Sequence, residues 1–166
     1  FQANGGFGGE LIPALGYVGS GGPLTNALYE GFAVISSDMG HTLEQITTFG
    51  VDPQARLDYG YDSMIKLTPM AKQLIRFSYD KLPDRSYAGG ASRGGNLALN
   101  AATRLPREYD GIYANSPSFE PPLSSIAQIY DFKELRKVAT EIDETITAFT
   151  DAERKVVADS VLNKCD

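Results

Sequence analysis

Short apolar runs, separated by glycine, proline and aspartate, recur along the first 119 residues. The run Phe32–Ser36 lies between Gly31 and Asp38, a pattern typical of a buried parallel strand. The same pattern predicts three further short strands, at Phe1–Ala3, Ser86–Ala88 and Ile112–Asn115.

Helical patterns lie between these runs. Thr68 and Pro69 suit an N-cap and a first helical turn, and Met70, Leu74 and Phe77 follow at helical spacing. We therefore expect a core-facing amphipathic helix from Thr68. Two more helices are predicted, at Leu24–Glu30 and Asn96–Thr103. A loop-and-turn region is predicted over Asp52–Tyr61. Strands that alternate with helices predict an α/β fold with a mainly parallel, doubly wound sheet flanked by helices.

The pattern changes at Glu120, where Pro121 and Pro122 follow and only helical signals remain. One helical region covers Leu123–Val138, and Thr150–Glu153 is a capping box that opens a helix through Leu162. We interpret residues 1–119 as part of an α/β core and residues 120–166 as the start of an inserted helical segment.

Composition excludes several classes of partner. The chain has 166 residues, 42% of them hydrophobic and 22% charged, and a net charge of −6. This charge argues against nucleic acid and anionic membrane surfaces as partners, and no apolar run reaches transmembrane length. The single cysteine, Cys165, cannot form a disulfide within this chain, so we expect it to be free or paired outside these residues.

The main candidate for chemistry is Gly90-Ala91-Ser92-Arg93-Gly94, a G-x-S-x-G pattern. A strand is predicted before it and a helix after it, which is the setting of a nucleophile elbow. Gly90 and Gly94 would allow a tight turn around Ser92, and Gly95 would let the helix begin against the sheet. The alternative is a glycine-rich turn that carries an ordinary surface serine.

Two further stretches could line the same site. Gly5-Gly6-Phe7-Gly8-Gly9 is a glycine loop after the first strand, where backbone N–H groups could stabilise an oxyanion, although it could also be a flexible loop. Asp38 and His41 follow the run Phe32–Ser36, at the end of a strand where α/β proteins place their sites. His41 is the only histidine, and we expect it to be structural or site-lining because the Ser–Asp–His order puts the base later in the chain.

Taken together, these motifs resemble the tannase and feruloyl esterase family of secreted microbial α/β hydrolases. The resemblance is carried by six ordered stretches: Gly5–Gly9, Ser37–His41, Ala71–Ile75, Tyr87–Gly95, Pro106–Pro117 and Cys165–Asp166. It implies that Ser92 is the nucleophile and that the oxyanion donors are the Arg93 amide and a glycine of the first loop, Gly5 or Gly6. It also implies a secreted or periplasmic enzyme and a substrate that is a small aromatic ester.

The chain departs from the family pattern in two ways. Ala91 stands where the family usually has a cysteine, so a disulfide clamp at this position is absent. The family's catalytic Asp and His come after a large lid, so the resemblance implies that these 166 residues are the front portion of a longer enzyme. Asp166 resembles the first carboxylate of a calcium-binding loop in that lid, whereas the hydrolysis itself needs no metal or cofactor.

We therefore expect a serine esterase for aromatic-acid esters, with little activity unless the rest of the hydrolase or a partner chain supplies Asp and His. Two alternatives remain at this stage. The first is another α/β hydrolase, such as a general carboxylesterase or a peptidase. The second is an inactive homologue that acts as a binding protein.

Overall fold

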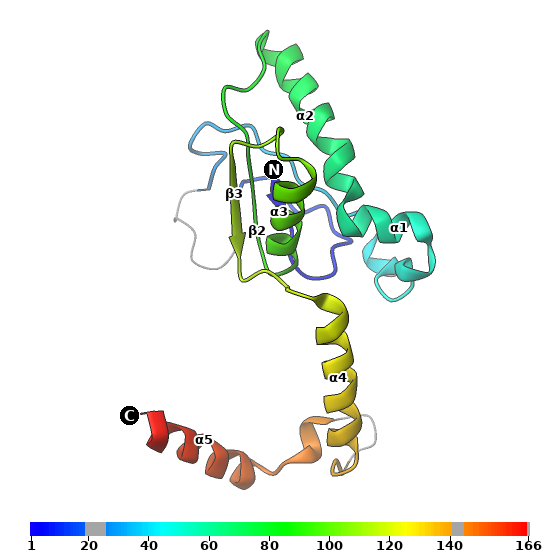
Figure 1. Cartoon of the computed structure of the whole chain (residues 1–166), viewed down its shortest axis with the longest axis vertical. Helices are drawn as coiled ribbons and strands as arrows, with labels where there is room; N and C mark the ends of the chain where they lie inside the picture. Colours follow the sequence, from blue (N-terminus) through cyan, green and yellow to red (C-terminus); the bar gives the residue numbers. More distant parts are fainter. Residues whose placement is uncertain (19–25, 141–144, 166) are drawn as a thin grey trace. The chain divides into compact units, whose positions relative to one another are not determined.

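The computed structural model describes residues 1–18, 26–140 and 145–165 (Figure 1). The chain divides into two compact units, Phe1–Ser118 and Phe119–Asp166.

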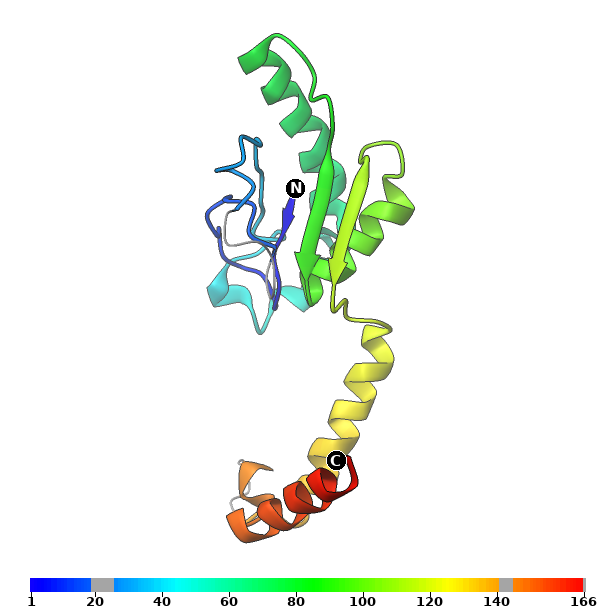
Figure 2. The same ribbon diagram turned by 90° about the vertical axis from the view of Figure 1, so that its left-hand side faces the viewer.

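The first unit contains a three-stranded parallel sheet (Figure 2). Its strands are β1 (Gln2–Ala3), β2 (Tyr87–Ala91) and β3 (Gly111–Asn115), in the order β1-β2-β3. The register pairs Ala3 with Gly90 and Ala91 with Asn115. Both pairings are parallel, which confirms the predicted α/β class and the three strands expected near these positions.

Helices supply the layer that covers this sheet. The helix α3 (Arg93–Arg104) follows β2 directly and packs against β2 and β3. It buries Leu97 and Ala101, which join Met64 and Ala88 in the main hydrophobic core. The remaining helical segments lie between residues 43 and 79: the 3₁₀ turns η1 (Leu43–Gln45) and η2 (Phe49–Val51), α1 (Pro53–Leu57), the π-helical turn η3 (Asp58–Asp62) and α2 (Ser63–Tyr79).

The run Phe32–Ser36, predicted to be a strand, is not one. Its backbone lies beside β1, where the Gln2 amide donates to the Ile35 carbonyl at 2.8 Å. No other backbone hydrogen bond joins this run to β1 in the part of the chain that is described, so the two segments do not form a ladder. The helix predicted over Leu24–Glu30 is also not observed. Residues 24 and 25 lie outside the described ranges, and residues 27–31 form turns instead of a helix.

The loop predicted over Asp52–Tyr61 is helical. Asp52 is the N-cap of α1, and its carboxylate accepts from the amides of Gln54 and Ala55. Proline at position 53 begins the helix, so Asp52 and Pro53 form a helix start and not the predicted turn.

The helix expected from Thr68 begins five residues earlier, at Ser63. The Thr68 hydroxyl is buried and hydrogen-bonds both the Met64 carbonyl and the Tyr109 hydroxyl, each at 2.6 Å, so Thr68 is not an N-cap. The apolar stripe expected to face the core is exposed instead, with Phe77 86% accessible. The prediction that Met70, Leu74 and Phe77 face the core is therefore wrong, because no described part of the chain buries these side chains.

The second unit is helical. It contains α4 (Pro121–Arg136), the 3₁₀ turn η4 (Thr145–Ala148) and α5 (Asp151–Cys165). The predicted capping box before α5 is confirmed, because Glu153 Oε2 accepts from the Thr150 amide at 2.8 Å and the Glu153 amide donates back to Thr150 Oγ1 at 3.3 Å. Among the described helices of both units, none is long and apolar enough to cross a membrane.

Candidate functional site

Ser92 lies at the sharp turn between β2 and α3. Its backbone has φ 56° and ψ −120°, a conformation that residues with a Cβ rarely adopt. The turn is held by hydrogen bonds from the Ser92 amide to the Asn115 carbonyl at 2.9 Å and from the Asn96 amide to the Ser92 carbonyl at 3.1 Å. The Ser92 residue is exposed, and its hydroxyl makes no hydrogen bond to any residue that the structure describes. This is the geometry of a nucleophile elbow.

The glycines around Ser92 are required by close backbone contacts. A Cβ on Gly90 would lie 2.3 Å from the Ala3 carbonyl oxygen, and one on Gly94 would lie 2.1 Å from the same atom. A Cβ on Gly95 would lie 2.6 Å from the Asn115 carbonyl oxygen. The two strands that flank β2 therefore approach the elbow so closely that only glycine fits at these three positions.

The glycine loop begins where β1 ends and lies beside the elbow. A Cβ on Gly5 would lie 3.2 Å from the Ala91 carbonyl oxygen, which places Gly5 next to the residue before Ser92. Gly5 and Gly6 are exposed, and their amides donate to none of the described residues. The Arg93 amide, in the first turn of α3, is likewise without an acceptor among those residues.

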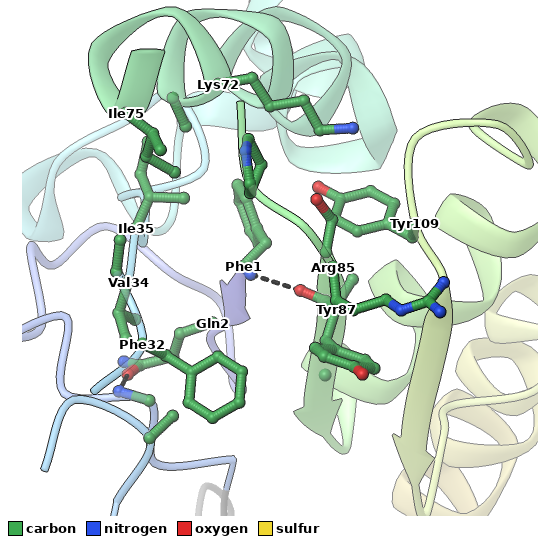
Figure 3. A pocket seen from close by; sticks show the side chains of 18 of the residues that line it. Phe1, Gln2, Phe32, Val34, Ile35, Lys72, Ile75, Arg85, Tyr87 and Tyr109 are labelled. Carbon is green, nitrogen blue, oxygen red and sulfur yellow. Dashed lines mark hydrogen bonds between the residues drawn. The ribbon is translucent and has the colours of Figure 1, made fainter. Parts of the chain in front are cut away.

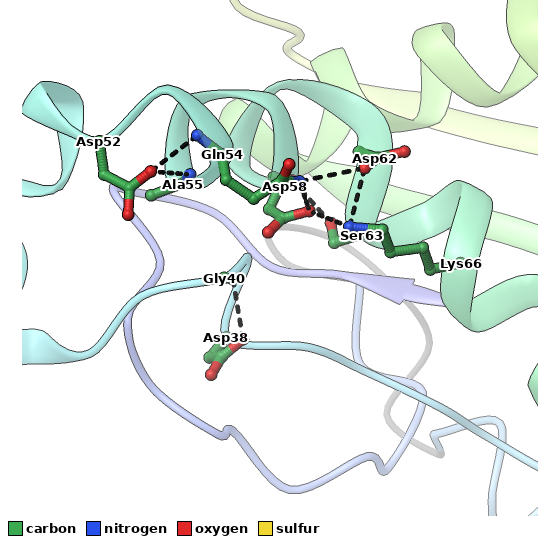
Figure 4. Close-up of polar contacts among 9 residues, drawn as sticks. All are labelled: Asp38, Gly40, Asp52, Gln54, Ala55, Asp58, Asp62, Ser63 and Lys66. Atoms are coloured by element: carbon green, nitrogen blue, oxygen red, sulfur yellow. Dashed lines mark hydrogen bonds and ion pairs between the residues drawn. The ribbon is translucent and has the colours of Figure 1, made fainter.

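Asp38 supports this loop. Its carbonyl accepts from the Gly9 amide at 2.8 Å, and its carboxylate accepts from the Gly40 amide at 2.9 Å (Figure 4). The far end of the glycine loop is thus fixed to the turn that carries Asp38.

His41 is buried away from solvent, with 3% of its surface exposed. Its ring stacks on Phe49 at a centroid distance of 3.9 Å and meets Tyr59 edge-on at 5.9 Å. Neither ring nitrogen hydrogen-bonds any described residue, and therefore neither contacts the Ser92 hydroxyl. In this geometry His41 supports an aromatic cluster.

The Arg93 side chain, which the sequence did not single out, extends from the elbow into the protein. Its guanidinium donates to the carbonyls of Tyr59 and Gly60 and to the Asn96 side chain, and its Cζ lies 4.3 Å from the centre of the Tyr59 ring. Burial lowers the pKa of this guanidinium below its ordinary value. Tyr59 therefore contacts the residue whose amide is the expected oxyanion donor.

Two acidic residues, Asp58 and Asp62, lie on η3 near Asp38, and Lys66 lies on the first turn of α2 (Figure 4). Lys66 bridges Asp58 at 3.0 Å and Asp62 at 2.9 Å, and its hydrogen bond lowers the pKa of the Asp62 carboxyl. Within the described ranges, no three His, Cys, Asp or Glu residues are arranged to hold a metal ion. The candidate calcium ligand Asp166 lies outside those ranges.

A wide cleft lies apart from Ser92. It has a volume of about 1100 Å³ and includes Lys72 of α2, Tyr109, and residues at the start of β2 such as Tyr87 (Figure 3). Ser92 does not line it, because the start of β2 is the end opposite to the elbow. A smaller hollow of about 260 Å³ lies between Gly9, Asp38 and the η1 turn, closer to the glycine loop.

Comparison with known proteins identifies related sequences. A profile of the family described as tannase and feruloyl esterase matches residues 2–166. A mono(2-hydroxyethyl) terephthalate hydrolase from Piscinibacter sakaiensis is 33% identical over 178 residues, covering 99% of this chain and 29% of that protein. An uncharacterised esterase from Agrobacterium fabrum is 34% identical over 117 residues, covering 69% of this chain and 21% of that protein.

A probable feruloyl esterase from Neosartorya fischeri is 29% identical over 136 residues, covering 82% of this chain and 25% of that protein. The chain thus spans between 21% and 29% of the length of these three relatives.

Proposed function

The chain belongs to the tannase and feruloyl esterase family, and we propose that Ser92 is the nucleophile of a carboxylic ester hydrolase. The observation that carries this proposal is the strained backbone of Ser92, which presents an exposed side chain between two close-packed glycines. Strain of this kind persists where the surrounding structure enforces it, and it is concentrated at functional sites.

The proposed reaction is a two-step acyl transfer. The Ser92 oxygen attacks the ester carbonyl, and the alcohol leaves after accepting a proton, which gives an acyl-enzyme that water then hydrolyses. The Arg93 amide and the Gly5 or Gly6 amide would donate to the oxyanion that forms. Each such donor contributes on the order of 3 kcal/mol to the transition state.

Ser92 needs a general base, and His41 does not suit this role because it is buried in an aromatic stack. We assign the base to a histidine, oriented by an aspartate, on a part of the hydrolase outside these 166 residues or on a partner chain. It follows that the 166-residue chain by itself should have little or no esterase activity.

Esters of aromatic acids are the substrate class that we propose. Two relatives are named for such esters, one for a terephthalate ester and one for feruloyl esters. By family resemblance we also propose a secreted or periplasmic enzyme that needs no metal for the chemistry. Within the described ranges, the acidic residues are not arranged to hold a calcium ion.

The test is mutagenesis in the intact protein that carries this sequence. Ser92→Ala should lower turnover of methyl ferulate or a mono-ester of terephthalate by about 10⁴-fold or more, because oxyanion donors alone cannot replace covalent catalysis. His41→Ala should lower turnover far less among molecules that remain folded.

Circular dichroism of both variants provides the control for folding. If folded His41→Ala protein lost as much turnover as Ser92→Ala, His41 would be the base and our assignment would be wrong. If Ser92→Ala kept its turnover, the nucleophile assignment would fail.

A further inference from the structure

Tyr59 contacts both segments that carry the expected oxyanion donors. Its hydroxyl donates to the Gly6 carbonyl at 3.4 Å, and its own carbonyl accepts from the Arg93 guanidinium. The same guanidinium lies over the Tyr59 ring, with Cζ 4.3 Å from the centroid. One residue on η3 therefore links the tip of the glycine loop to the first residue of α3.

The tip of the loop has few other restraints. Asn4 is tied to the Ser37 carbonyl at 3.0 Å and Gly9 to the Asp38 carbonyl at 2.8 Å, so both ends of the loop are anchored. Between these ends, the bond from Tyr59 is the one hydrogen bond that a described residue makes to the loop. Gly6 itself has φ 64°, and no atom lies within 4 Å of the position that its Cβ would occupy. Packing therefore does not fix Gly6.

The Tyr59 ring, in contrast, is well fixed. Phe49 lies against it at a centroid distance of 5.0 Å and His41 meets it edge-on at 5.9 Å, while Arg93 covers it. These contacts hold the ring whether or not its hydroxyl is present. They also give the buried His41 a role as part of the support for Tyr59.

We propose that Tyr59 is a positioning residue that holds the glycine loop and the Arg93 amide in register, so that donors from both segments point at one oxygen atom. This inference rests on the proposed esterase function. Tyr59 does not touch the reacting atoms; it acts through the Gly6 carbonyl and through the Arg93 side chain.

The test compares two hydroxyl deletions in the intact protein that carries this sequence. Tyr59→Phe keeps the ring contacts and removes only the bond to Gly6. Because deletion of a whole oxyanion donor costs about 10²- to 10³-fold in kcat, a donor that is only loosened should cost less, about tenfold. KM should stay within about twofold, since the donors act on the transition state more than on the bound ester.

Tyr61→Phe is the matched control. Tyr61 lies on the same π-helical turn, but its ring packs under Arg104 at 3.8 Å and its hydroxyl makes no hydrogen bond to a described residue. Its kcat should equal that of the unmodified protein. The midpoint of thermal unfolding should be similar in the two variants, because a bond to an exposed loop contributes little to stability.

A second readout separates positioning from general damage. A phosphonate whose P=O group occupies the oxyanion position should inactivate Tyr59→Phe about tenfold more slowly than Tyr61→Phe. Equal kcat and equal inactivation rates in the two variants would overturn the inference, as would a loss of kcat that simply followed a lower unfolding midpoint. If Ser92→Ala retained its activity, the proposed function would fail instead, so the two failures are distinguishable.

Discussion

Ser92 adopts a backbone conformation that is unfavourable for every residue except glycine. With φ 56° and ψ −120°, it stores strain on the order of 1–3 kcal/mol. The fold retains this strain because the turn is bonded on both sides, through the amide and the carbonyl of Ser92. The stability of a Ser92 variant should therefore depend on whether the new residue tolerates this backbone conformation.

We predict that Ser92→Gly is more stable than Ser92→Ala. Glycine relieves the strain but gains extra freedom in the unfolded chain, worth about 0.5–1 kcal/mol, so the net advantage should be about 1 kcal/mol. Urea unfolding of the two variants of the intact protein measures this difference. Equal stability, or a more stable alanine variant, would mean that the elbow is not strained.

At this scale the sequence indicated the positions of Ser92, Gly90 and Gly94 at the turn, because glycine spacing reports directly on backbone crowding. It did not indicate the role of Tyr59 or of the Arg93 side chain. Their contact joins a π-helical turn to the elbow, and no local pattern encodes a pairing between segments so far apart in the chain. His41 is buried in the aromatic cluster, and its expected role as a structural or site-lining residue that is not the general base stays a prediction.

At the scale of elements, the predicted strands of the sheet were found where a helix packs against them. β2 and β3 face α3, and both were indicated by short apolar runs. The run Phe32–Ser36 looks equally like a strand in sequence, but among the described residues a single backbone hydrogen bond joins it to β1. Thr68 and Pro69 have the sequence pattern of a helix start, but they lie within α2, where the Thr68 hydroxyl donates to the Met64 carbonyl. Tertiary contacts decided these two cases.

The contact between α3 and β1 gives a prediction at this scale. Gly94→Ala would place a Cβ 2.1 Å from the Ala3 carbonyl oxygen, and that atom belongs to rigid backbone. We expect a loss of stability of about 3 kcal/mol from this overpacking, together with a loss of activity, because β1 leads directly into the glycine loop.

Gly50→Ala is the control for this substitution. Gly50 has no atom within 4 Å of its Cβ position, so its replacement should change stability by less than about 1 kcal/mol. Thermal unfolding of both variants, followed by circular dichroism, checks the prediction. A Gly94→Ala protein as stable and active as Gly50→Ala would show that the elbow is not tightly packed against β1.

At the scale of the whole molecule, the three parallel strands and their helices are consistent with an incomplete α/β-hydrolase fold. The resemblance to the tannase and feruloyl esterase family, based on ordered motifs, is confirmed by the match over residues 2–166. The predicted helical character after Glu120 also agrees with α4 and α5. The sequence could not indicate that the stripe on α2 would be exposed, because burial depends on what lies opposite a helix and not on its own pattern.

The central claim is that Ser92 is the nucleophile, and covalent labelling tests it most directly. The intact protein that carries this sequence would be treated with an aryl phosphonate ester, digested and analysed by mass spectrometry. We predict one adduct, on the peptide that contains Ser92, that appears at the rate at which esterase activity is lost. Complete inactivation with the adduct on another residue, or with Ser92 unmodified, would contradict the claim.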